Sequence, residues 1–302
     1  AALESLNLSG WTCKVNSLSG MFDGCSQLQT LNLTGFTTPG VTDMSYMFNG
    51  CSSLRALDLS SFSTSEVTNM NLMFNGCSSL ETLDLSNFVG TKVGYVNSMF
   101  NGCASLKSLD LHNFAETKVT NFRKWFAGCT ALESLNMPRL APTSIADMSG
   151  MFKDCRSLTQ LDLSGWNTTQ VTNMSEMFSG CSSLLSLDLS SFTTKAVTTF
   201  SQMFAGCTSL TNLNLSSFSS VQSAYNNRLT NMSGMFLNCE ELTAVDISGI
   251  ITYNVTNFSS LYEGCKSMES IDVSKLQTNN CRNFSRMFAG CEKLKSIDVS
   301  DF

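Results

Sequence analysis

The residues of this 302-residue chain that could most clearly do chemistry are its cysteines, because of their number and their spacing. Thirteen are present, enough for a disulfide framework or a metal site. Eleven follow a fixed interval: a series starts at Cys25 and repeats every 26 residues to Cys207, and Cys239, Cys265 and Cys291 continue it. The step from Cys207 to Cys239 is 32 residues, so six extra residues lie within one interval. A zinc site is not expected, because one thiol per interval and a single histidine cannot supply a tetrahedral cluster of ligands.

Acidic residues form a second regular series. In Leu57-Asp58-Leu59 an aspartate stands between two leucines, and the same place in other repeats holds Asp or Asn. A row of carboxylates could bind cations, a basic partner or hydroxyl-rich glycans. Alternatively, these groups hydrogen-bond to neighbouring serines or to the backbone on a solvated surface, where the closeness of like charges has an electrostatic cost. The candidate binding residues are Asp58, Asp84, Asp110, Asp162, Asp188, Asp246, Asp272 and Asp298.

Catalysis finds little support in the sequence. His112 is the only histidine, so no Ser–His–Asp arrangement is expected, and no glycine-rich phosphate loop occurs. We therefore expect no enzyme activity, no cofactor and no metal. Charged residues make up 14% of the chain, the net charge is -6 and no basic cluster is present, which argues against nucleic acid as a partner. No apolar run approaches the roughly 18 residues that a membrane span requires.

The elements that position these series can be read in a single repeat. Residues 54–77 read LRALDLSSFSTSEVTNMNLMFNGC, and the alternation at the start predicts a short strand with one buried face. Asn69 is expected to cap a short helix, and Gly76 stands where a left-handed residue would end it. The helix is predicted from four apolar residues spaced as one stripe, namely Met70, Met73, Phe74 and Cys77.

A fixed period of this length is the signature of a stacked solenoid, in which each coil buries its apolar face against its neighbours. The predicted fold class is an α/β solenoid, a leucine-rich-repeat-like right-handed stack of 26-residue strand–turn–short-helix coils with one parallel sheet. Because helices are wider than strands, we expect the sheet to line a concave face. One domain should cover residues 1–302, with about eleven repeats, a terminal strand segment and an insertion at 219–228.

In such a stack the serial cysteines face the core, where a thiol acts as a small hydrophobe. We expect free, buried thiols, although disulfides between neighbouring coils stay open because stacked Cα atoms about 5 Å apart can be bridged. Cys13 lies outside the series, in a turn, and is expected to be the most accessible thiol.

The blocks FSTSEVTNMNLMFNGCSSLETLDLSNF and WNTTQVTNMSEMFSGCSSLLSLDLSSF closely resemble the Mycoplasma-type, BspA-like leucine-rich repeats of bacterial surface proteins. The resemblance covers essentially the whole chain. It implies a protein that is extracellular or attached to the cell surface and that serves adhesion or interaction, and it brings no catalytic residues. The chain departs from the pattern by a one-residue deletion near Cys13 and by the insertion at 219–228.

Two kinds of function fit these observations. The first is a non-catalytic extracellular or cell-surface scaffold that mediates adhesion, or binds protein or glycan on a cell or matrix surface, through its concave strand face. The insertion is a second candidate site, with Tyr225, Asn226, Asn227 and Arg228. The alternative is a structural building block that self-associates through uncapped ends into a filament or larger assembly. A third idea is binding to an ordered surface such as ice or crystalline polysaccharide, because Ser, Thr and Asp recur regularly.

Overall fold

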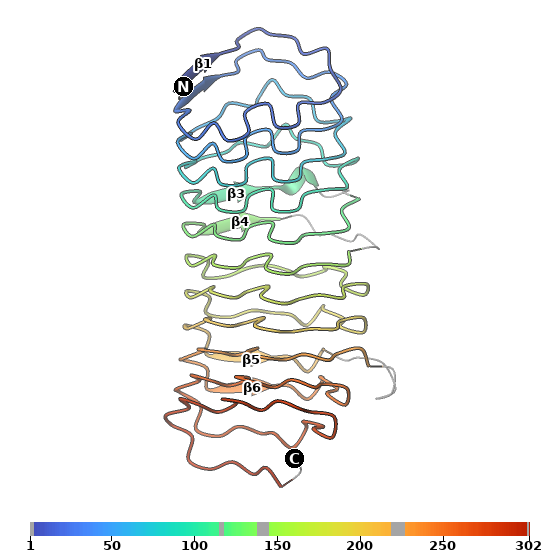
Figure 1. The fold of residues 1–302 in the computed structure, drawn as a ribbon, viewed down its shortest axis with the longest axis vertical. Coiled ribbons are helices and arrows are strands. Elements are labelled where there is room, and N and C mark those ends of the chain that lie inside the picture. Colours follow the sequence, from blue (N-terminus) through green and yellow to red (C-terminus); the bar gives the residue numbers. More distant parts are fainter. Residues whose placement is uncertain (1–2, 115–117, 138–144, 219–226, 301) are drawn as a thin grey trace. The chain divides into compact units, whose positions relative to one another are not determined.

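Each 26-residue repeat folds as one coil, and stacking of the coils aligns equivalent residues in columns (Figure 1). The computed structural model describes residues 3–114, 118–137, 145–218, 227–300 and 302. The chain divides into two compact units, Ala1–Pro142 and Thr143–Phe302, and each unit is a stack of coils. The expectation of one domain over residues 1–302 stays a prediction.

Short strands pair in parallel with the neighbouring coil, as predicted. In the described residues these are β1 (Ser5–Asn7) with β2 (Thr30–Asn32), β3 (Ser108–Asp110) with β4 (Ser134–Asn136), and β5 (Asn212–Asn214) with β6 (Ala244–Asp246). A 3-10 helix, η1, covers His112–Phe114. Leu109 of β3 lies opposite Leu135 of β4 and is 4% exposed, whereas its neighbours on both sides face solvent. The alternation of buried and exposed residues is confirmed.

The solenoid class is confirmed, but the short helix in each coil is wrong. The described residues contain no α-helix, and residues 71–76 form consecutive turns. Leu72, in the middle of the apolar stripe, has a φ of 54°, whereas an α-helix requires a φ of about −63° at every position. Other coils also have a positive φ at this place, at Gly20, Tyr46, Ser98, Lys124, Gly150, Glu176, Gln202, Gly234, Ser260 and Arg286.

Hydrogen bonds between coils explain why turns replace the helix. The amide of Leu72 donates to the carbonyl oxygen of Asn97 in the next coil at 2.9 Å. The amide of Met73 donates to the carbonyl oxygen of Met70 in its own coil at 3.2 Å. Backbone amides in this segment thus donate alternately to carbonyl oxygens of their own coil and of the next coil. They do not form the hydrogen bonds between residues four apart that define an α-helix. The expectation of a concave strand face rested on wide helices, and the described residues do not form them.

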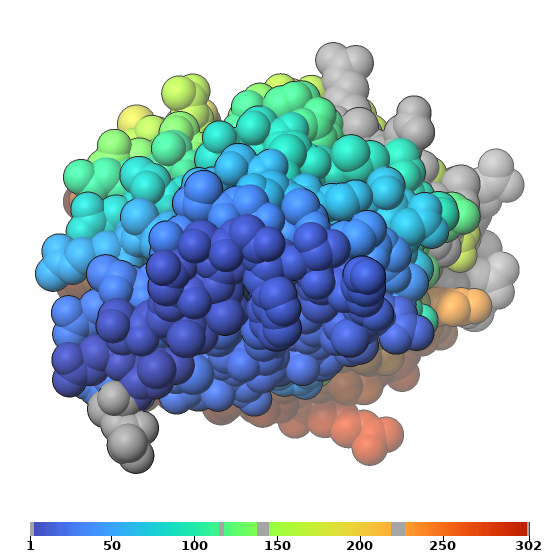
Figure 2. All heavy atoms as spheres, turned by 90° about the horizontal axis from the view of Figure 1, so that it is seen from above, coloured from blue at the N-terminus to red at the C-terminus, as the bar shows by residue number. Residues whose placement is uncertain are grey.

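Apolar columns fill the inside of each unit. The rings of Phe48, Phe74 and Phe100 are buried and stack with centroids 5.6 and 5.7 Å apart. Burial requires a coil on both sides: Phe36 is 0% exposed, but its counterpart Trp11 in the first coil is 51% exposed. Figure 2 shows the surface of the first coils, in dark blue, from their N-terminal end. Each coil therefore obtains its core from its neighbours.

The glycine before each serial cysteine is required by the backbone, as predicted. Gly76 has a φ of 72°, and an added Cβ there would lie 3.5 Å from the Cα of Gly50 in the preceding coil. Where the column departs from glycine it holds Asp154 and Asn238, with φ values of 59° and 57°. Asp and Asn tolerate this left-handed conformation better than most side chains.

Candidate functional site

The aspartate series forms an exposed column on the strand side of each unit. We call this column, together with the residues two and three positions before each aspartate, the strand face. Asp110 of β3 pairs with Asn136 of β4, whose Nδ2 donates to Oδ1 of Asp110 at 3.0 Å. An amide beside a carboxylate relieves part of the repulsion between like charges. All the predicted aspartates are exposed: Asp58, Asp84 and Asp110 in the first unit, and Asp162, Asp188, Asp246, Asp272 and Asp298 in the second.

Strand-face aspartates also hold the turn that follows each strand. Oδ1 of Asp84 accepts the amide of Ser86 at 2.8 Å. This bond favours the charged carboxylate and is the main reason that the pKa of Asp84 is lowered, against smaller raising effects from Asp58 and Asp110. Hydrogen bonds from the residue two positions later likewise lower the pKa of Asp58, Asp110, Asp188, Asp246, Asp272 and Asp298. The column is therefore negatively charged at neutral pH.

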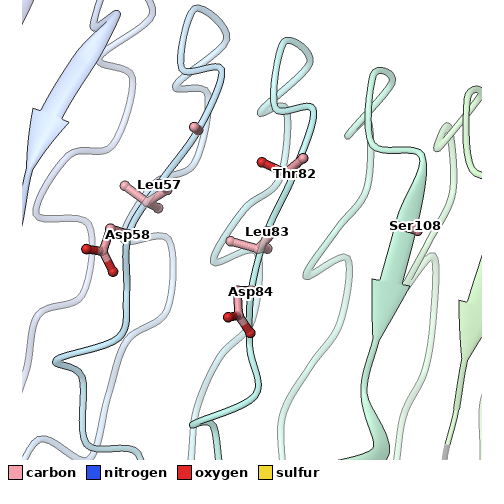
Figure 3. Close-up of a pocket in the computed structure, with 7 residues that line it drawn as sticks. Leu57, Asp58, Thr82, Leu83, Asp84 and Ser108 are labelled. Atoms are coloured by element: carbon pink, nitrogen blue, oxygen red, sulfur yellow. The ribbon is translucent and has the colours of Figure 1, made fainter.

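Shallow hollows lie between successive strand-face aspartates. One, with a volume of about 420 Å³, is lined by Ala56, Leu57, Asp58, Thr82, Leu83, Asp84 and Ser108 (Figure 3). A second, of about 520 Å³, shares Leu83, Asp84 and Ser108 and continues to Asn136. In the second unit, a hollow of about 430 Å³ lies along Asp188, Asn214 and Asp246.

Small residues two positions before the aspartates leave these hollows open, and the sequence analysis did not single them out. Ala56, Ser108 and Ala244 are examples that line the three hollows. Their signal in the sequence is the recurrence of Ala, Ser or Thr at that place, beside a charged or polar residue. The arrangement offers hydrogen-bond acceptors at regular intervals, with small side chains beside them in these hollows. Such a surface can receive cationic or hydroxyl groups.

Two further observations bear on ligand chemistry. Nδ1 of His112 lies 2.9 Å from Oδ1 of Asp110, at the edge of the strand face. Within the part of the chain that the structure describes, His, Cys, Asp and Glu side chains form no group of three or more that could hold a metal ion. Likewise, none of the described residues belongs to a helix with the length and apolar character to cross a membrane.

Residues of the predicted insertion site are only partly within the described residues. Tyr225 and Asn226 lie outside them. Asn227 is 5% exposed; its Nδ2 donates to the carbonyl oxygen of Ile251, and its Oδ1 accepts the amide of Leu229 at 2.9 Å. Its side chain therefore anchors the end of the insertion to the stack. Arg228 is exposed.

The serial cysteines face the core, as predicted. Sγ of Cys77 donates to the carbonyl oxygen of Phe48 in the preceding coil at 3.1 Å, and the same contact recurs along the column. Burial raises the pKa of Cys129 to about 12, so this thiol stays protonated and unreactive. All thirteen cysteines are free thiols in the structure.

The expectation for Cys13 is wrong. Cys13 is 6% exposed, because its turn stacks on the next coil through the bond from its amide to the carbonyl oxygen of Thr37, at 3.0 Å. The more accessible thiols are the half-buried ones of Cys25, Cys281 and Cys291.

Parallel coils with Leu-x-Leu strands, joined to an exposed polar strand face, define a leucine-rich-repeat solenoid. A leucine-rich cell surface protein from Faecalibacterium prausnitzii has this fold: the TM-score is 0.55 over 98% of this chain and 82% of that chain, at 19% identity. Leucine-rich repeat proteins from Bacteroides ovatus and Eubacterium ventriosum are also similar. The first is 19% identical over 98% of this chain and 78% of that chain, with a TM-score of 0.46. The second is 14% identical over 97% and 84%, with a TM-score of 0.49.

The chain belongs to the family described as "Mycoplasma protein of unknown function, DUF285", which matches residues 16–138, 136–229 and 219–302. These matches extend over most of the chain and confirm the family resemblance seen in the repeats. No curated protein sequence matches the chain.

Proposed function

We propose that this protein is a non-catalytic scaffold outside the cell or on its surface, and that it binds protein or glycan partners through the strand face. The observation that carries the proposal is the column of exposed, ionised aspartates with hollows between them. Carboxylates at regular intervals can engage several groups of one extended partner, so that individually weak contacts act together. The name of the similar F. prausnitzii structure, a cell surface protein, supports the location.

Charge suggests the chemistry of the partner. The chain has 24 acidic and 18 basic residues, and in each unit the strand face carries a column of exposed aspartates. Complementary charge favours the association of a basic segment, whereas hydroxyl groups of a glycan could donate to the same carboxylates. The two partners differ in their dependence on salt, because screening weakens attraction between exposed charges.

The test removes charge from the strand face without disturbing its turns. Asn can replace Asp there, since Oδ1 of Asn7 accepts the amide of Ser9 at 3.0 Å in the same kind of turn. One double variant carries Asp84→Asn and Asp110→Asn in the first unit. The other carries Asp162→Asn and Asp188→Asn in the second unit.

Binding to a lysine-rich peptide and to an array of immobilised glycans would be measured at low and high salt. The control variant, Glu66→Gln with Glu240→Gln, removes two negative charges outside the strand face. We expect at least one double variant to weaken binding about tenfold, which is about 1.4 kcal/mol, while the control binds normally. A partner that both double variants bind as tightly as the parent would place the binding surface elsewhere.

A further inference from the structure

Three asparagine–glycine steps lie in one column of the first unit. Asn49-Gly50, Asn75-Gly76 and Asn101-Gly102 occupy the same place in successive coils. An asparagine followed by glycine can deamidate through attack by its own backbone. The amide nitrogen of the glycine attacks the side-chain carbonyl carbon, a new N–C bond forms, and ammonia leaves. Water then opens the resulting succinimide ring to aspartate or isoaspartate. Glycine has no Cβ to hinder the attack.

Backbone hydrogen bonds between coils hold the attacking nitrogens. The amide of Gly50 donates to the carbonyl oxygen of Asn75 at 2.7 Å, and the amide of Gly76 donates to that of Asn101 at 2.7 Å. The amide of Gly102 makes the same bond to Ala127, also at 2.7 Å. The glycine nitrogen must lose its proton to form the ring, so the bond to the next coil has to break first.

The side chains of the same asparagines form a hydrogen-bonded ladder. This ladder holds the side-chain amide that the glycine nitrogen would attack. Nδ2 of Asn75 donates to Oδ1 of Asn49, and Nδ2 of Asn101 donates to Oδ1 of Asn75, both at 2.6 Å. The ladder ends at a carboxylate, because Nδ2 of Asn49 donates to Oδ1 of Asp23 at 2.6 Å. Both reacting groups are therefore immobilised by neighbouring coils.

We propose that Asn49, Asn75 and Asn101 are deamidation sites that the folded stack protects from reaction, and that their modification requires local opening of the coil. Asn49 and Asn75 each use both Nδ2 and Oδ1 in the ladder, so they are expected to react more slowly than Asn101, whose equivalent in the next coil is Ala127. Its modification would also damage the stack, because isoaspartate lengthens the main chain and replaces a donor by an acceptor. At Asn49 the product places a carboxylate against Asp23, where like charges repel.

The rate test follows the three sites by peptide mapping after incubation at mildly alkaline pH. The folded protein is compared with the protein in urea. We expect each site to react at least about tenfold more slowly when folded, equivalent to about 1.4 kcal/mol for local opening. Asn69, followed by methionine, is the internal control and should change little in either state. A variant with Asn75→Ser, the residue found at the equivalent Ser179, should still fold and lose one site. Equal rates in the folded and unfolded protein would overturn the proposal.

The damage test uses the reaction products made by mutation. Asn49→Asp should lower the Tm more than Asn101→Asp, because only the former faces Asp23. Replacing Asp23 by Asn in the Asn49→Asp background should restore the Tm, even if the single variant folds poorly. If the two single variants melt alike and the second substitution restores nothing, the role assigned to the ladder is wrong.

Discussion

Single carboxylates on the strand face do two things at once: they carry negative charge outward and hold the next turn of the backbone. Asp84 illustrates both, since it is exposed and its Oδ1 accepts the amide of Ser86 at 2.8 Å. The binding hypothesis and the hydrogen-bonding alternative for this column are thus compatible. A substitution can separate them, because asparagine keeps the acceptor and alanine removes it.

The first prediction compares Asp84→Asn with Asp84→Ala. The asparagine variant should keep the free energy of unfolding of the parent, because Oδ1 of asparagine can accept the same amide. The alanine variant should be less stable than both, because the amide of Ser86 loses its side-chain acceptor. Urea unfolding at neutral pH measures both. Equal loss in the two variants would show that charge, and not the turn, sets the contribution of Asp84.

The second prediction concerns pH. Folding lowers the pKa of strand-face aspartates. Their ionised carboxylates therefore stabilise the folded protein at pH values above the pKa that these groups have in the unfolded chain. This contribution is lost as the pH falls through their lowered folded values. We therefore expect the Tm to fall as the pH drops below the usual pKa range of an aspartate. The Asp84→Asn, Asp110→Asn variant should show a weaker fall, and a Tm that rises on acidification would contradict the expected sign.

A third prediction addresses a buried polar group. Tyr262 stands in the phenylalanine column between Phe236 and Phe288, is 0% exposed, and its hydroxyl has no hydrogen-bond partner among the described residues. Desolvation also raises its pKa. Tyr262→Phe should stabilise the protein by about 1 kcal/mol, because an unsatisfied buried hydroxyl is costly. A thermal melt compares it with the parent, and a lower Tm would indicate that the hydroxyl is satisfied, for instance by water.

At the scale of the element, the turn segment of each coil is set by a residue with positive φ. Lys124 is exposed and has a φ of 53°, a conformation that most L-residues adopt at a cost. Gly150 and Gly234 meet the same requirement without strain. The side chain at this place therefore matters less for packing than for the backbone it allows.

The fourth prediction tests this backbone requirement. The free energy of unfolding of the Lys124→Gly variant should equal that of the parent or exceed it by up to about 1 kcal/mol. Relief of the left-handed strain offsets the larger entropy of glycine in the unfolded chain. Lys124→Val should be less stable than the parent, because a branched Cβ disfavours positive φ. The two variants are compared by urea unfolding. A helical segment would give the opposite order, with glycine the less stable.

At the scale of the whole molecule, the burial and the reactivity of a thiol depend on whether a neighbouring coil covers it. Ten of the thirteen cysteines are buried, and the half-buried ones are Cys25, Cys281 and Cys291. Desolvation raises the pKa of Cys51 to about 12 and shifts other thiols of the column in the same direction. Cys25, Cys281 and Cys291 are therefore the most accessible thiols of the structure.

A fifth prediction follows for alkylation without reductant. The native protein should be labelled at Cys25, Cys281 and Cys291, and at all thirteen cysteines after denaturation. Intact mass and peptide mapping decide it. Denatured protein that reaches full labelling only with reductant would show that disulfides form along the column.

Much of this architecture can be predicted from the sequence, because repetition makes each local pattern visible many times. The period, the inward columns of Leu57, Phe74 and Cys77, the left-handed glycine at Gly76 and the family all follow from side-chain types and spacing. The strand-face aspartates were also identified as exposed. Their binding role stays a proposal, since no spacing in one chain names a ligand.

Only the tertiary structure decided the features that depend on bonds between coils. Apolar spacing in the stripe of Met70 and Phe74 fits a helix as well as paired turns, and glycines at 20, 150 and 234 were the available sign against a helix. The outcome depends on whether an amide such as that of Leu72 bonds within its coil or to the next one. The burial of Cys13 and the asparagine ladder have the same origin. Such bonds join residues about one repeat apart, so they exist only once the coils have stacked.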